Sequence, residues 1–220
     1  MNRLEFHFAG QDLTALPSGA LWWAATGTLV VSDLHLGKAE RRARRDGQLL
    51  PPYETQETLD RLDSDIAELA PARVICLGDS FDDLWAAAAL ADTARLWLAR
   101  LQAGREWIWI EGNHDPGATD LGGTHRAELA LQGLTFRHIA APEGRAEVSG
   151  HYHPKVRLPT RGRLVVRRAF LLNARRLVLP AYGAYTGGLS TDSASLTGLM
   201  GPGAEALLTG KTMHRIPMPC

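Results

Sequence analysis

The chain has 220 residues, of which 45% are hydrophobic and 22% charged, and its formal net charge at pH 7 is zero. These values exclude extended disorder and fit one globular unit, so we expect a single domain over residues 1–220. No apolar stretch approaches the ~20 residues of a membrane span. Acidic residues near the start argue against a signal peptide, so we expect a cytoplasmic protein with no membrane partner.

The net charge of zero hides a segregation of charge along the chain. Residues 54–83 include nine acidic side chains and two arginines, whereas residues 155–176 include eight basic side chains and no acidic one. A second basic cluster lies within residues 38–45. Such clusters are typical of a surface that binds a polyanion.

Short apolar runs predict buried strands at residues 28–32, 73–77 and 107–110. Helices are predicted between them. Residues 38–45 read as a helix, and Leu59, Leu62, Ile66 and Leu69 recur at helical spacing after a Pro pair. Residues 84–101 read as one helix with Trp85, Leu96 and Trp97 facing inward. This alternation predicts an α/β fold with parallel strands.

Further strands are predicted towards the C-terminus. Residues 134–137 and 146–149 are short apolar runs that end at His138 and Gly150. Three more runs, at 164–166, 170–172 and 177–179, make the C-terminal third rich in strands and punctuated by turns, as expected of a second sheet.

Four polar motifs carry the candidate chemistry: DLHLGK (33–38), GDSFD (78–82), GNHD (112–115) and GHYH (150–153). The first three directly follow predicted strands, and functional groups collect beyond the carboxyl ends of parallel strands. Asp, His and Asn are ligands that suit two adjacent Mn²⁺, Fe or Zn²⁺ ions. The motifs therefore predict a hydrolase with two metal ions.

The motifs and their order resemble those of the calcineurin-like metallophosphoesterases, which run DxH, GDxxD, GNH(D/E) and GHxH. The resemblance implies a four-layer α/β/β/α sandwich with the metals at one edge. It also implies a ligand set: Asp33, His35 and His153 for the first metal, Asn113, His138 and His151 for the second, and Asp79 bridging both. The implied reaction is in-line attack on phosphorus by a hydroxide that bridges the metals.

The resemblance also implies a proton donor. His114 stands beside a ligand and would protonate or stabilise the leaving oxygen, with Asp115 a candidate to orient its imidazole. One ligand position stays open between two histidines. We prefer His138 to His125, because His138 ends a predicted strand shortly before GHYH, whereas His125 follows a Gly-rich loop.

Lys38, Arg42 and Arg45 are candidates for binding the substrate phosphates, because a basic helix beginning at the metal edge would point towards the substrate. The alternative for this cluster is an ordinary solvated helix face.

Three strings, DLHLGK, GHYHPKV (150–156) and LPAYGAYTGG (179–188), are similar to those of the bacterial ligase-associated DNA damage response endonucleases. This resemblance implies a manganese-dependent endonuclease that cleaves single-stranded DNA in DNA repair. It also implies functional association with a DNA ligase, an exonuclease and a helicase.

Two other functions compete with this one. The first is a phosphodiesterase or pyrophosphatase for a small or lipid-linked substrate such as UDP-diacylglucosamine, whose enzymes usually carry an inserted apolar cap. The second is a scaffold without catalysis, which would be expected to lack ligand or proton-donor residues that this sequence has. The sequence leaves the native metal, DNA versus RNA, endo versus exo action and the oligomeric state open.

Overall fold

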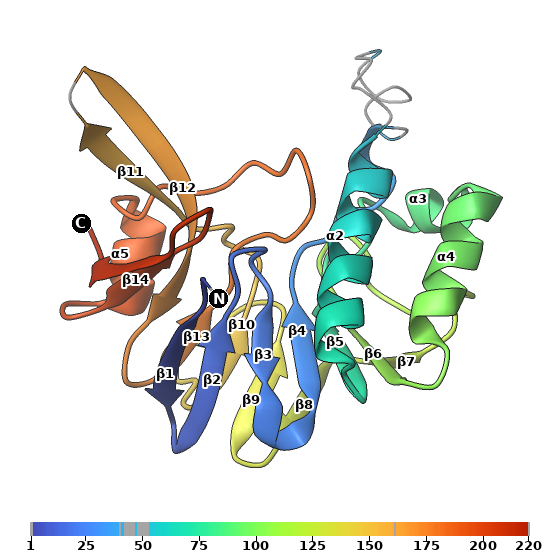
Figure 1. The fold of residues 1–220 in the computed structure, drawn as a ribbon, viewed down its shortest axis with the longest axis horizontal. Coiled ribbons are helices and arrows are strands. Elements are labelled where there is room, and N and C mark those ends of the chain that lie inside the picture. The colour runs from blue at the N-terminus through green and yellow to red at the C-terminus, as the bar shows by residue number, and fades with distance from the viewer. Residues whose placement is uncertain (1, 40, 42–46, 48–52, 161, 220) are drawn as a thin grey trace.

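A computed structural model describes residues 2–39, 41, 47, 53–160 and 162–219. Two mixed β-sheets pack face to face, and helices cover their outer faces (Figure 1). The result is an α/β fold of four layers, α/β/β/α, as the family resemblance implied. Among the described helices, none combines the length and the apolar character needed to cross a membrane.

The first sheet supplies the strand ends that matter for function. Its order follows the chain: β1 (Leu4–Phe8), β2 (Gln11–Ala15), β3 (Leu21–Trp23), β4 (Thr28–Val31), β5 (Arg73–Leu77), β6 (Glu106–Ile110) and β7 (Thr124–Arg126), with a 3₁₀ turn η1 (Ala24–Thr26) before β4. The pairs from β1 to β4 are antiparallel, and those from β4 to β7 are parallel. The parallel pairing predicted for the central strands is therefore confirmed.

The second sheet has the order β15-β14-β12-β13-β10-β9-β8. Its strands are β8 (Glu128–Leu131), β9 (Leu134–Arg137), β10 (Glu147–Ser149), β12 (Arg163–Leu172), β13 (Arg176–Val178), β14 (Glu205–Leu208) and β15 (His214–Pro217). Strand β10 runs parallel to both β9 and β13. Strand β11 (Lys155–Thr160) pairs with β12, and the two form a hairpin that extends away from the sheets in Figure 1.

Alternation along the strands separates the layers. In β4, Val30 points into the core between the two sheets, while Leu29 and Val31 point to the helical side. There they meet Leu59 and Leu62 of helix α2 (Glu54–Leu69), beside helix α4 (Asp92–Gln102). Helix α5 (Ala194–Met200) covers the outer face of the second sheet. The central strands are thus buried on both faces, which explains their continuous apolar runs.

The helix predicted over residues 84–101 is wrong in two respects. The segment forms two helices, α3 (Leu84–Ala88) and α4, separated at residues 89–91. Trp85 and Leu96 face solvent, with 74% and 72% exposure, while Trp97 packs against the core as predicted. The inward face of α3 consists of Ala86 and Ala87, because a small side chain is what fits against the backbone of Gly37. An alanine-rich run gives no hydrophobic period from which this could be read.

Candidate metal centre

The candidate ligands of the first sheet follow strands whose ends are aligned. Val31 pairs with Cys76, and Leu77 pairs with Ile110, so β4, β5 and β6 end side by side. The chain leaves these strands at DLHLGK, GDSFD and GNHD, which places Asp33, Asp79 and Asn113 at one edge.

The second sheet brings its histidines to the same edge. Ser149 pairs with Arg137, so the parallel strands β9 and β10 end together, and His138 and His151 follow them. Two hydrogen bonds join the sheets there. His138 Nδ1 donates to Leu77 O at 2.8 Å, and His151 N donates to Asp33 Oδ2 at 3.0 Å. The set Asp33, His35, Asp79, Asn113, His138, His151 and His153 is called the metal edge below.

Three side chains of the metal edge form one group of possible ligands. The Nε2 atom of His153 lies 3.1 Å from Asp33 Oδ1 and 3.4 Å from the Nε2 atom of His35. One ligand atom from each residue lies within 4.8 Å of the others, which suits a single cation. This is the trio that the resemblance implied for the first metal.

A second group contains Asp79, Asn113, His138 and His151. His138 Nε2 lies 3.0 Å from Asn113 Oδ1, 3.3 Å from His151 Nδ1 and 3.4 Å from Asp79 Oδ2. The same Asp79 oxygen is 4.0 Å from His35 Nε2, in the first group. The carboxylate of Asp79 therefore lies between the two groups, where a bridging ligand has to be.

The donor atoms in both groups fit cations. His35 Nδ1 lies 2.9 Å from Asp82 Oδ1, and His138 Nδ1 is bonded to the carbonyl of Leu77. Each of these bonds places the imidazole proton on Nδ1 and leaves an Nε2 lone pair facing the other ligands. Lone pairs of nitrogen and carboxylate oxygen repel one another at 3–4 Å unless a cation or a proton lies between them. The arrangement thus fits two divalent metal ions of the kind that bind N and O ligands.

The electrostatics of the metal edge favour positive charge. Burial would lower the pKa of His138, but the carboxylates of Asp79 and Asp33 raise it to about 9. Burial would raise the pKa of Asp79, but His138 and the other histidines lower it to about 2. Burial would also raise the pKa of Asp33, but its interaction with His153 and the other histidines lowers that pKa below its usual value. The carboxylates are therefore ionised at neutral pH and available to a metal ion.

The backbone at the metal edge is held in an unfavourable conformation. Five ligand candidates have positive φ: Asp33 (53°), His35 (47°), Asp79 (45°), His151 (71°) and His153 (46°). Each such residue costs on the order of 1–3 kcal/mol, and residues of this kind cluster at functional sites. Close approach adds to the constraint, because a Cβ on Gly112 would lie 2.1 Å from Asp79 N. These conformations lower the free energy of unfolding, and they orient the ligand side chains towards one place.

His114 lies beside the ligands with its ring held by Asp82. Its Nδ1 donates to Asp82 O at 2.9 Å, and its Nε2 lies 4.0 Å from Asp79 Oδ2 with the side chain 31% exposed. The expectation that Asp115 orients His114 is wrong. The Asp115 carboxylate instead accepts backbone N–H groups of four residues: Asp79, Ser80, Phe81 and Gly112. Asp115 therefore ties the GDSFD loop to the GNHD loop.

Asp82 is a residue of the site to which sequence reasoning gave no role. Its two oxygens are shared between His35 Nδ1 and Arg41 Nη1, at 2.9 and 2.8 Å, and the carboxylate is buried. Arg41 also lies 3.3 Å from Asp83 Oδ2. The second Asp of GDSFD was the available signal, but its partners could be found only in three dimensions.

The structure distinguishes between His138 and His125 as the remaining candidate ligand. His138 lies within the second group, whereas His125 accepts the backbone N–H of Thr119 and lies against Trp109 with ring centroids 6.3 Å apart. The structure thus brings His138 to the metal edge and leaves His125 outside it.

Basic side chains lie next to the metal edge. Lys38 is half-buried at the start of the basic segment, and its charge contributes to the lowered pKa of Asp82. Burial, followed by the charges of Arg168 and Lys38, lowers the pKa of Lys155. Lys155 is also close to a candidate ligand, because a Cβ on Gly188 would lie 3.1 Å from both Lys155 Cε and His153 Cβ. Arg42 and Arg45, also expected to bind phosphate, lie outside the described residues.

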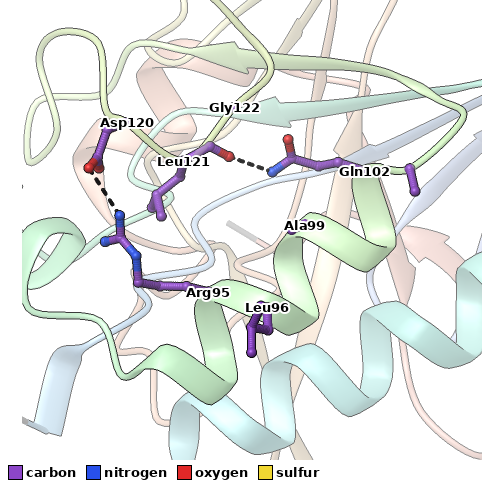
Figure 2. A pocket seen from close by; sticks show the side chains of 8 residues that line it. Arg95, Leu96, Ala99, Gln102, Asp120, Leu121 and Gly122 are labelled. Carbon is purple, nitrogen blue, oxygen red and sulfur yellow. Dashed lines mark hydrogen bonds and ion pairs between the residues drawn. The ribbon is translucent and has the colours of Figure 1, made fainter.

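Two surface pockets differ in their relation to the metal edge. One of about 350 Å³ includes Asn113, His138 and Ile139 in its lining and so opens beside the second ligand group. The other, of about 480 Å³, lies between α4 and the loop before β7 (Figure 2). There Arg95 pairs with Asp120, and Gln102 donates to the carbonyl of Leu121. No candidate ligand lines this second pocket, so it is separate from the site.

Comparisons with known proteins agree with this geometry. The calcineurin-like phosphoesterase family matches residues 27–173, more than half of the chain, and the chain belongs to that family. It is accordingly a metal-dependent phosphodiesterase. No curated protein matches the chain. Among solved structures, it is similar to the crystal structure of Pseudomonas putida nuclease MPE, with a TM-score of 0.78 and 29% sequence identity. That similarity covers 98% of this chain and 100% of the other.

Proposed function

We propose that the chain is a manganese-dependent endonuclease that cleaves single-stranded DNA in DNA repair. The observation that carries the proposal is the similarity of almost the whole chain to the crystal structure of a nuclease. The basic side chains next to the metal edge support a polyanionic substrate.

The metal edge would hold two divalent ions. Asp33, His35 and His153 would bind the first ion, Asn113, His138 and His151 the second, and Asp79 both. Such ions supply Lewis acidity to the phosphoryl oxygens and activate water as a nucleophile. Asp82 would keep His35 in the tautomer that binds a metal, and Leu77 O would do the same for His138.

His114 would donate the proton that the leaving oxygen requires. Its Nδ1–H is bonded to Asp82 O, so Nε2 is the nitrogen that faces the reaction. When the bond from phosphorus to the leaving oxygen breaks, the proton on Nε2 passes to that oxygen and leaves a neutral imidazole. The partly exposed ring then regains a proton from water.

The phosphates on either side of the cleaved bond would contact the basic surface. Lys155 lies near His153, since a Cβ on Gly188 would be 3.1 Å from both side chains, and Lys38 follows His35 by three positions, with Arg42 and Arg45 after it in the chain. Such contacts are independent of base sequence, since they involve only the phosphate backbone.

We further propose that the chain works in the cytoplasm as one domain over residues 1–220, with a DNA ligase, an exonuclease and a helicase as functional associates. The support for this context is the resemblance of DLHLGK, GHYHPKV and LPAYGAYTGG to the ligase-associated endonucleases.

Circular single-stranded DNA tests the proposed function, because a circle has no ends and only an endonuclease can open it. With Mn²⁺, the purified protein should convert circles to linear strands, and chelation or Asp79→Asn should stop the conversion. Parallel reactions with circular RNA and duplex DNA define the preference. Intact circles, together with hydrolysis of UDP-diacylglucosamine, would establish the small-molecule alternative instead.

A further inference from the structure

The loop formed by residues 182–190 is fixed at both ends to segments that carry ligands of the first group. Near its start, Gly183 N donates to Asp33 O at 3.1 Å. Near its end, Leu189 N donates to Tyr152 O at 3.2 Å, and a Cβ on Gly188 would lie 2.2 Å from His153 O. In Figure 1 this orange segment crosses between the β11–β12 hairpin and α2. Both ends of the loop are therefore anchored at the metal edge.

Tyr185 occupies that middle position in a conformation that its residue type disfavours. Its φ is 53°, in the left-handed region where Gly or Asn would be accommodated at lower cost. Its side chain is 50% exposed, so burial does not account for an aromatic residue there. It stands two positions after Gly183 in the chain, so the Cα atoms of the two residues are at most about 7 Å apart. A strained, half-exposed aromatic residue thus follows closely on the residue that is bonded to the backbone of the candidate ligand Asp33.

Cationic side chains accompany the ring. Lys155 Nζ donates to the carbonyl of Thr186, the residue after Tyr185, at 3.0 Å. Arg157 lies two residues further along β11, on the same face as Lys155, and is exposed. Arg168 pairs with Lys155 across the hairpin and donates to carbonyls of the loop, including Gly183 O at 2.9 Å, so this face is turned towards the loop.

The same face of the hairpin carries exposed apolar side chains further from the metal edge. Val166 pairs with Arg157, and Leu164 pairs with Pro159, which places both on the face of Lys155. Their exposed fractions are 51% and 59%. The surface therefore combines positive charge with apolar and aromatic contact, which matches the phosphates and bases of a single strand.

We propose that Tyr185 is a stacking platform for a base next to the cleaved phosphate, with Lys155 and Arg157 holding the phosphates that lead away along the hairpin. The proposal rests on the proposed function and adds to it the reason for single-strand preference. Bases of a duplex are already stacked on one another, whereas bases of a single strand are free to stack on a protein ring.

Binding of a fluorescein-labelled single-stranded oligodeoxynucleotide, measured by fluorescence anisotropy in chelator so that the strand stays intact, tests the platform. Tyr185→Ala should weaken binding roughly 5- to 100-fold, whereas Tyr185→Phe and Tyr185→Trp should retain it. The log–log slope of affinity against salt should stay unchanged in Tyr185→Ala. It should fall by roughly 0.7 in Arg157→Ala, because that variant removes a phosphate contact.

Leu96→Ala is the matched control, since Leu96 is an exposed apolar residue of α4 that lines the separate pocket. Tyr185→Ala should hydrolyse a small chromogenic phosphodiester as fast as the wild type. Equal loss on this substrate and on DNA would overturn the proposal, because it would mean that Tyr185 only supports the loop. Binding of Tyr185→Ala that equals that of Leu96→Ala would overturn it too.

A measurement on the wild type covers the case in which Tyr185→Ala does not fold. A set of strands that each lack one base should show weakened binding for one place of the missing base, the place that stacks on Tyr185. In Tyr185→Trp, loss of the base at that place should no longer weaken binding, because the larger ring stacks on neighbouring bases. Equal affinity for all abasic strands would contradict stacking. If the wild type neither binds nor cleaves single strands, the proposed function itself fails, which is a different result from cleavage that is indifferent to Tyr185.

Discussion

The metal edge and the surface formed by loop 182–190 with the β11–β12 hairpin are adjacent, yet they are built in opposite ways. At the metal edge, buried carboxylates and imidazoles bond to one another and to backbone groups of both sheets. On the neighbouring surface, Arg157, Tyr185 and Val166 are exposed. The contrast suggests a division of labour in which the buried side chains determine the chemistry and the exposed ones select the substrate.

The strongest test of that division is the loss of the bridging position. Asp79→Asn removes a negative charge from between the two ligand groups while conserving shape, so we expect loss of bound metal and of activity on every substrate. Metal analysis after Mn²⁺ loading, beside a chromogenic phosphodiester assay, measures both. Asp12→Asn, an exposed acid paired with His7, is the control and should behave as wild type. Full activity in Asp79→Asn would refute the two-metal assignment.

A smaller effect is expected from the proton donor. His114→Ala should lower turnover by roughly 10²–10⁴-fold on a phosphodiester with a poor leaving group, because the leaving oxygen then departs without a proton. Metal content should remain near the wild-type value. His7→Ala, an exposed histidine, serves as the control. If His114→Ala loses its metals, His114 is a ligand, as its place in the cluster with His35 and Asp82 also permits.

The smallest of the three effects is expected at Asp82, which acts through His35. Asp82→Asn weakens the bond that fixes the His35 tautomer, so metal affinity should fall roughly 10- to 100-fold. Activity should return when Mn²⁺ is raised, which a purely structural defect would not allow. In the control Asp83→Asn, Arg41 loses one contact while His35 keeps its carboxylate. If metal affinity fell equally in both variants, the effect of Asp82 would act through Arg41 and not through His35.

The sequence predicted the central strands and the helix that contains Leu59, Leu62 and Ile66 well, and residues 84–101 poorly. Strands β5 and β9 have the predicted bounds, because their apolar runs are interrupted sharply by polar motifs or turns. Residues 84–101 contain so many alanines that hydrophobic spacing could not place Trp85 or Leu96, both of which are exposed. Strand β7, whose three residues are all polar, gave no usable pattern either.

The residues of the candidate site that belong to sequence motifs, or that end a predicted strand, could be predicted from the sequence. All seven residues of the metal edge come from local strings or from the end of a predicted strand. The partners of Asp115 and Asp82 were not predictable. The carboxylate of Asp115 bonds to backbone groups as far as 36 residues away in the chain, and that of Asp82 bonds to a ring 47 residues away. Such contacts depend on how loops meet after folding, which periodicity does not encode.

The metal edge draws ligands from both sheets, and this gives it a mechanical role. Asp33, Asp79 and Asn113 move with the first sheet, whereas His138 and His151 move with the second. The distance between the two ligand sets therefore depends on the distance between the two sheets. That distance is set by the side chains packed between the sheets, such as Val30 and Phe136. A substitution that changes side-chain volume in the core between the sheets would alter the affinity of the site for metal ions. Metal affinity would then report on packing that no substrate ever touches.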